Sequence, residues 1–126
     1  MIALNDLSYK VRRAIYNVHS LLGPGLLESV YEAALLYEFE EMGIFAISQI
    51  DVPVKYKNIQ LKIGFRIDIL VEDQMIIEVK SVENLMDVHK KQVLTYLKLT
   101  GKKLGFLVNF NSVSIIDRES LFRIIN

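Results

Sequence analysis

The fold of this chain is decided by two short segments, GFRIDIL at residues 64–70 and MIIEVK at residues 75–80. Each is apolar and carries an acidic residue, and only a few residues separate them. A hairpin around residue 73 is therefore predicted, in which Asp68 faces Glu78 and Arg66 faces Lys80. Because side chains alternate along a strand, Asp68, Glu78 and Lys80 are expected to project from one face of the sheet.

Two carboxylates in this arrangement need a compensating positive charge. Directly opposite Cβ atoms lie roughly 5 Å apart, where like charges destabilise a sheet, and a buried carboxylate without a partner is costly. Lys80 supplies one charge, and a hard divalent cation such as Mg²⁺ would supply two to an oxygen-rich site. The competing interpretation is a salt bridge between Lys80 and one carboxylate on an exposed face.

The rest of the chain predicts an α/β fold with a mixed sheet flanked by helices. Apolar periodicity places helices at about residues 8–22, 27–42 and 85–100. Strands are expected at residues 50–56, 61–71, 75–79 and 104–110, the last buried on both faces. Residues 113–116 and 121–125 are expected to form a terminal strand or hairpin. Pro53 favours a sheet edge or a strand irregularity, and Lys57-Asn58 favours a turn.

Composition excludes several classes of protein. The 126 residues fit one domain, with 52% hydrophobic and 24% charged residues. The absence of cysteine excludes disulfides and thiolate zinc sites. No uncharged apolar run approaches the roughly 18 residues of a membrane span, and we expect a cytoplasmic protein. The net charge is zero, so a nucleic-acid partner would require a local basic patch.

Glu28 is a third candidate carboxylate, in the first turn of the second expected helix, directly after Gly23-Pro24-Gly25. A glutamate here also favours the positive end of the helix dipole without any further function. Glu32 lies one turn later on nearly the same face. We expect Glu32 to be solvated or to lie outside the set of direct metal ligands.

The segment Gly25-Leu26-Leu27-Glu28-Ser29-Val30-Tyr31 resembles the signature of the GxxExxY proteins, which are small members of the PD-(D/E)XK nuclease-like superfamily. Nearly the whole chain takes part in this resemblance, with several motifs in the right order. The further matching segments are residues 51–54, 56–57, 65–71, 77–82, 89–97 and 105–110.

The resemblance implies a restriction-endonuclease-like αβββαβ core with an extra N-terminal helix, in a single domain over residues 1–126. Glu28 would be the helical acid, Asp68 the central metal-binding aspartate, and Glu78 and Lys80 the ExK pair. The implied activity is Mg²⁺-dependent or Mn²⁺-dependent hydrolysis of phosphodiester bonds in DNA, by an endonuclease or an exonuclease. The Val79 carbonyl would join Asp68, Glu78 and Glu28 as a metal ligand, and Lys80 would position water.

The helix after the ExK strand carries further candidates. Gln92 would contact metal-bound water or phosphate, and His89, Tyr96 and Lys90 would contact the substrate. Arg66, in the strand expected at residues 61–71, would also contact the substrate. A polar helix surface is the alternative explanation for His89 and Gln92. Most other basic residues are expected to be solvated, although several could line a substrate groove: Lys55, Lys57, Lys62, Lys91, Lys102 and Lys103. The C-terminal tail resembles the family only loosely, so a substrate contact by Arg123 stays open.

Three functions remain in competition on the sequence. The first is a Mg²⁺-dependent DNA nuclease, and the second is a non-catalytic nucleic-acid-binding or assembly module that keeps the fold. The third is an RNA-directed or repair-associated enzyme of the same chemistry. A chain of 126 residues has little room for a separate recognition domain. Specificity would then come from a partner or from homodimerisation.

Overall fold

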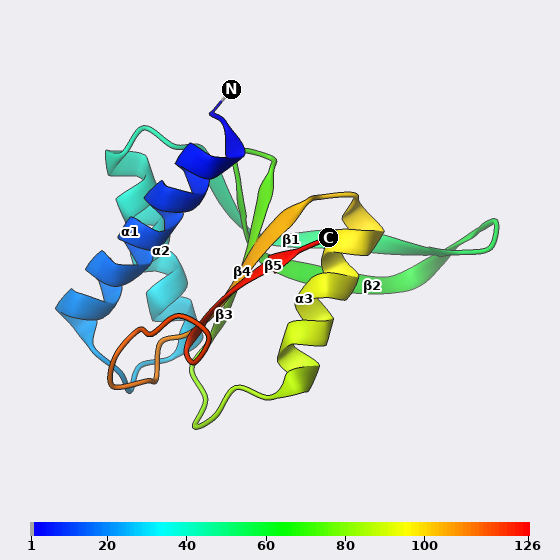
Figure 1. Cartoon of the computed structure of the whole chain (residues 1–126). Helices are drawn as coiled ribbons and strands as arrows, with labels where there is room; N and C mark the ends of the chain where they lie inside the picture. Colours follow the sequence, from blue (N-terminus) through cyan, green and yellow to red (C-terminus); the bar gives the residue numbers. More distant parts are fainter. Residues whose placement is uncertain (1) are drawn as a thin grey trace.

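A five-stranded mixed sheet with helices on both faces forms the fold (Figure 1). The computed structural model describes residues 2–126. Along the chain, the elements are α1 (Leu4–Leu22), α2 (Glu28–Glu41), β1 (Ala46–Tyr56), β2 (Ile59–Val71), β3 (Met75–Lys80), α3 (Asp87–Thr100), β4 (Leu104–Asn109) and β5 (Leu121–Ile125). The predicted mixed sheet, with its extra N-terminal helix, is confirmed.

The strands lie side by side in the order β1-β2-β3-β4-β5. Neighbouring strands are antiparallel except for β3 and β4, which are parallel. Helix α3 forms the crossover between these two strands, as a parallel connection requires. β3 and β4 occupy the centre of the sheet, and β4 is buried along its whole length, as its apolar sequence predicts.

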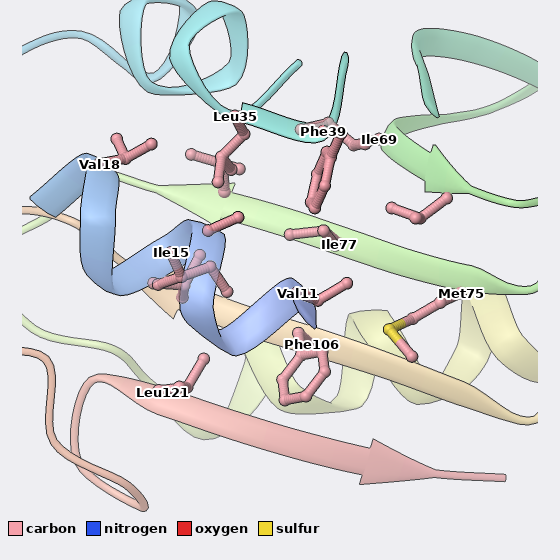
Figure 2. Close-up of a cluster of buried hydrophobic side chains, with 14 of the residues drawn as sticks. Val11, Ile15, Val18, Leu35, Phe39, Ile69, Met75, Ile77, Phe106 and Leu121 are labelled. Carbon is pink, nitrogen blue, oxygen red and sulfur yellow. The ribbon is translucent and has the colours of Figure 1, made fainter. Parts of the chain in front are cut away.

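Helices α1 and α2 cover one face of the sheet. Apolar residues one helical turn apart, such as Val11 and Ile15 in α1 and Leu35 and Phe39 in α2, are fully buried there. They pack against Ile77 and its neighbours on the sheet, as Figure 2 shows. This is the larger of the two apolar clusters, and it fixes α2 relative to the central strands.

Helix α3 covers the opposite face with a smaller apolar cluster. Val93 and Leu97 are fully buried against Ile76 and Leu107 of the sheet. Gly105 of β4 allows this close approach, because a Cβ atom there would lie 3.0 Å from Cγ1 of Val93. The tight contact holds α3 over β4, the parallel neighbour of the strand that carries Glu78.

Three parts of the chain differ most from the sequence prediction. Strand β1 begins at Ala46, four residues before the expected start at residue 50. Helix α1 begins at Leu4, four residues before the expected start, because Leu4 and Leu7 extend the same buried stripe. Residues 113–116 form no strand, and Val113 is 89% exposed. The buried hydroxyl of Ser120 closes this segment into a loop instead, accepting from the Ile116 N–H and donating to the Ser114 carbonyl. At the C-terminal end of the described residues, β5 pairs with β4.

The β1–β2 hairpin extends well beyond the rest of the sheet (Figure 1). Of the residues of β2, the last three, from Ile69 to Val71, pair with β3. The ladder of the hairpin shifts register between Pro53 and Lys55, in agreement with the edge strand and irregularity expected at Pro53. Among the helices of residues 2–126, none is long and apolar enough to cross a membrane.

Candidate functional site

The candidate site lies where β2 and β3 part. The two strands pair at Val71–Met75, Leu70–Ile76 and Ile69–Ile77, which is the register predicted from the sequence. Beyond Ile69 the ladder stops, and carboxylate side chains accept the hydrogen bonds of two backbone N–H groups. The Asp68 N–H donates to Glu78 Oε1 at 3.2 Å, and the Val79 N–H donates to Asp68 Oδ2 at 2.9 Å. The two carboxylates are therefore held against each other by crossed hydrogen bonds.

Asp68 also marks a break in the alternation of β2. Ile67 packs in the cluster under α3, whereas Ile69 packs in the cluster under α1 and α2, although both have the same parity. In β1, the corresponding irregularity falls at Gln49, whose φ is +55°. Asp68 thus sits where the hairpin changes face, and this local distortion brings its side chain onto the end of β3.

Glu78 carries the strongest electrostatic perturbation. The residue is only 3% exposed, and its pKa is raised to about 9, first by burial and then by the negative charge of Asp68. The positive charge of Lys80 opposes this rise. Without a further cation, the Asp68–Glu78 pair retains a proton at neutral pH, so Lys80 alone does not compensate for both carboxylates.

The loop that leads into α2 is tied to the same end of β3. The hydroxyl of Tyr31 donates to the Gly23 carbonyl at 2.6 Å and accepts from the Leu26 N–H at 3.1 Å. Ser81, directly after Lys80, donates to the Leu26 carbonyl at 2.6 Å. Glu28 follows this anchored loop as the first residue of α2, where its side chain is exposed.

Glu32 is buried, which contradicts the solvated alternative and leaves the other one, a position outside the direct metal ligands, as a prediction. Gln49 donates to Glu32 Oε1 at 2.6 Å. Burial raises the pKa of Glu32, the charges of Asp68 and Glu28 raise it further, and the Gln49 hydrogen bond opposes the rise. Glu32 therefore lies within electrostatic range of both Asp68 and Glu28. Sequence reasoning missed Gln49, because an isolated glutamine in a strand gives no signal of this contact.

Helix α3 carries Tyr96 within electrostatic range of the carboxylates, and Gln92 lies beside Tyr96. The Tyr96 ring stacks on Phe65 with centroids 4.2 Å apart. Burial raises the pKa of Tyr96, and the charges of Glu78 and Asp68 raise it further, against a hydrogen bond with Gln92. Oε1 of Gln92 is buried and has no hydrogen-bond partner within residues 2–126. Gln92 thus keeps a free, buried acceptor next to Tyr96.

The other expected substrate contacts are engaged elsewhere. His89 Nδ1 accepts from the Met86 N–H at 2.9 Å and caps α3. The Lys90 ammonium lies over the Phe122 ring and 3.5 Å from Asp87. We had expected Arg66 to face Lys80, and this was wrong, because the β2–β3 ladder ends at Ile69. The Arg66 Nε instead donates to Asp51 of β1 at 2.9 Å.

The donor set suits a hard divalent cation with few protein ligands. No group of three or more His, Asp or Glu side chains within residues 2–126 is gathered closely enough to enclose a metal. The paired oxygens of Asp68 and Glu78 instead offer a small, oxygen-rich site. Mg²⁺ commonly binds through one or two carboxylates and keeps several waters. The raised pKa of Glu78 and the unpaired oxygen of Gln92 are consistent with this kind of ion.

A family model for the PD-(D/E)XK nuclease superfamily matches residues 5–121. The chain belongs to this superfamily. PD-(D/E)XK nucleases generally use divalent metals and act on nucleic acids. In this member of the superfamily, Asp68, Glu78 and Lys80 lie at the positions where the strands of the restriction-endonuclease-like core part.

A solved structure, the crystal structure of SSO0001, shares the fold with a TM-score of 0.58 and 19% sequence identity. The match covers 97% of this chain and 62% of that one, so the chain spans about three fifths of the length of SSO0001. At this identity, the likeness concerns the fold alone. No curated protein matches the chain.

Proposed function

We propose that this PD-(D/E)XK protein is a Mg²⁺-dependent nuclease of the GxxExxY type that hydrolyses phosphodiester bonds in DNA. The observation that carries the proposal is the Asp68–Glu78 pair, joined by crossed hydrogen bonds and short of one positive charge. Such a pair retains a proton in the absence of a cation, and a metal ion that binds the two carboxylates releases this proton.

In this proposal, Asp68, Glu78 and the Val79 carbonyl hold the ion, with Mn²⁺ as a substitute for Mg²⁺. When bound, the ion lowers the pKa of water and offsets charge on the phosphate. Lys80 orients the attacking water or neutralises the charge that develops on the phosphate oxygens. Lys80 follows Glu78 by two residues in β3, so both side chains leave the strand on the α3 side.

Residues from the two flanking helices complete the proposed site. Gln92 accepts a hydrogen bond from water through its unpaired Oε1, and Tyr96 holds Gln92 in place. Glu28 reaches the ion directly or through water from the anchored start of α2. Glu32, fixed by Gln49, adds negative charge next to Asp68 and strengthens cation binding.

The test is cleavage of labelled duplex DNA by purified protein with Mg²⁺ or Mn²⁺. Asp68→Ala and Lys80→Ala should each abolish cleavage, whereas Lys98→Ala, an exposed lysine of α3, should leave it unchanged. RNA substrates assayed in parallel separate a DNA-directed from an RNA-directed enzyme. Cleavage that survives both Asp68→Ala and Lys80→Ala would show that this site is not responsible.

The second candidate is a non-catalytic nucleic-acid-binding or assembly module. It is favoured by one observation, that the acids of residues 2–126 do not gather into a three-ligand metal cage. Metal titration separates the two candidates. Binding of Mg²⁺ or Mn²⁺ that is lost in Asp68→Asn supports the nuclease, and no binding at millimolar metal supports the module.

A further inference from the structure

The outer part of the β1–β2 hairpin, residues 50–66, is here called the hairpin arm. It is a two-stranded ribbon that continues past the point where β3 leaves β2 (Figure 1). From Lys55 to Gly64, every residue is exposed. A two-stranded ribbon alone is marginally stable in water. Ile50, Val52 and Phe65 at the base of the arm pack against the cluster under α3, whereas residues 55–64 are exposed. An exposed ribbon of this length is therefore expected to contact something outside the chain.

The hairpin arm carries a disproportionate share of positive charge. It contains four basic residues and one acidic residue, a net charge of +3, whereas the whole chain is neutral. The remainder of the chain therefore carries −3. Asp51 and Arg66 pair with each other at the base of the arm. This leaves Lys55, Lys57 and Lys62 without an acidic partner in residues 2–126.

The shape of the arm is set by a sharp local contact. The ladder slips between Pro53 and Lys55, and opposite this point a Cβ atom on Gly64 would lie 2.0 Å from the Val52 carbonyl oxygen. Only glycine permits so close an approach of the two backbones. The irregularity creates a concavity of about 710 Å³ between residues 51–53 and 60–66. The arm is therefore a bent ribbon with a hollow along its side.

The base of the arm is continuous with the candidate active site. Phe65 of the arm stacks on Tyr96 of α3. The charges of Glu78 and Asp68 raise the pKa of Tyr96, so both carboxylates lie within electrostatic range of this ring. A ligand placed at the carboxylates therefore meets the arm directly. Six residue steps lead from Phe65 to Ile59, which is about 20 Å of extended strand. This length corresponds to about six base pairs of duplex at 3.4 Å each.

We infer that the hairpin arm is a second nucleic-acid contact, which holds the sugar-phosphate backbone of duplex DNA beside the Asp68–Glu78 site. The inference rests on the proposed function and names how that site acquires its polyanionic substrate. Lys55, Lys57 and Lys62 neutralise phosphates on the flank of the duplex, and the net negative charge of the rest of the chain favours approach along the arm. Contacts of this kind position a duplex without reading its sequence.

The apolar side chains of the arm define the alternative occupant. Ile59, Leu61 and Ile63 alternate along β2 and are 65%, 42% and 80% exposed. A second copy of the chain could cover such a stripe. The unpaired lysines favour a polyanion, because a protein interface tends to exclude lysine from its centre. Isoleucine side chains beside lysines can also pack against sugars in a groove of the duplex.

The test measures the binding of a labelled duplex of about 24 base pairs, which is longer than the arm. EDTA is present, so that hydrolysis plays no part. The arm variant is Lys55→Gln/Lys57→Gln/Lys62→Gln. The matched control is Lys10→Gln/Arg13→Gln/Lys98→Gln, which makes the same change in net charge outside the arm. The arm variant should lower the slope of log affinity against log salt by about 2 to 3, at about 0.9 per phosphate contact, and the control should change it by less than about 1.

The outcomes separate the arm from the active site. If the arm variant binds with the wild-type salt slope, or if the control loses as much, the inference is wrong. It is also wrong if wild-type protein sediments as a dimer that Ile63→Ser dissociates, because the apolar stripe would then be covered by a second copy. Loss of cleavage in Asp68→Ala with the arm-dependent salt slope retained would leave the inference intact. Absence of cleavage in the wild type would contradict only the proposed function.

Discussion

Asp68 and Glu78 meet through a backbone-to-side-chain hydrogen bond, from the Asp68 N–H to Glu78 Oε1, at the position where the next rung of the β2–β3 ladder would stand. A strand pair that parts in this way exposes backbone donors, which the two carboxylates then satisfy. The separation of β2 from β3 therefore creates the site. The effect of the two carboxylates on the free energy of unfolding can be measured.

The first prediction concerns stability against pH. The folded-state pKa of Glu78, about 9, lies above its ordinary value of 4.5, so folded protein binds a proton that unfolded protein releases between these values. The free energy of unfolding should therefore be greatest below about pH 4.5 for this group and should fall as pH rises toward 9. The limiting slope is about 1.4 kcal/mol per pH unit. Urea unfolding in EDTA at pH 5.5 to 8.5 measures it.

Glu78→Gln provides the control for this titration, because the amide imitates the protonated carboxyl and does not ionise. Its unfolding free energy should depend less on pH than that of the wild type and should exceed it at pH 8.5. An identical pH dependence in the two proteins would assign the slope to other groups.

The second prediction concerns divalent metal. An ion that binds only the folded state stabilises it by about 1.4 kcal/mol at ten times the dissociation constant. For a chain of this size, this corresponds to a rise of a few degrees in melting temperature. Asp68→Asn should remove most of the rise, and Glu119→Gln, an exposed acid outside the site, should keep it. Equal rises for Asp68→Asn and wild type in thermal melts would place the ion elsewhere.

The third prediction separates function from stability at Gln92. Its buried Oε1 has no partner, so Gln92→Leu removes an unsatisfied acceptor along with the hydrogen bond to Tyr96. We expect an unfolding free energy within about 1 kcal/mol of wild type. Cleavage should fall by at least about tenfold, because a misplaced reactant is costly in rate. Thr95→Val, on an exposed position of α3, is the comparison; full cleavage in Gln92→Leu would give Gln92 a structural role only.

The fourth prediction concerns the bend in the hairpin arm. Gly64→Ala places a Cβ atom against the Val52 carbonyl oxygen, so the two strands must move apart. Amide NMR shifts should change along residues 50–66 while those of β4 stay fixed, with a stability loss of about 1 to 3 kcal/mol. Lys62→Ala, two residues away and exposed, should change few shifts. Unperturbed arm resonances in Gly64→Ala would contradict the close contact.

The register at the site was predictable from the sequence. The turn between the segments at residues 64–70 and 75–80 is short, and period-two alternation leaves few registers that bury both strands. The pairs from Val71–Met75 to Ile69–Ile77 follow that register. Helix boundaries followed from apolar spacing, apart from the start of α1. The sequence motif for Glu28 placed it at the start of α2, where the structure has it.

The contacts beyond the ladder were not predictable. Alternation assumes a regular strand, whereas β2 changes face at Asp68 opposite Gln49. That distortion explains why Arg66 pairs with Asp51 and not with Lys80. The composition of residues 113–116 predicts a strand, but these residues form a loop. Its conformation depends on hydrogen bonds of one buried serine hydroxyl, which no local pattern specifies.

Strand β2 is a single element of 13 residues whose two ends have opposite surroundings. Residues 69–71 are buried between two strands and under helices, while residues 59–64 are exposed in the arm. Amide hydrogen exchange should therefore span nearly its whole range along one strand, from fast local opening near Ile59 to exchange through global unfolding near Val71. Asp68 lies at the boundary, so the candidate site is expected to join a segment with slow amide exchange to one with fast local opening.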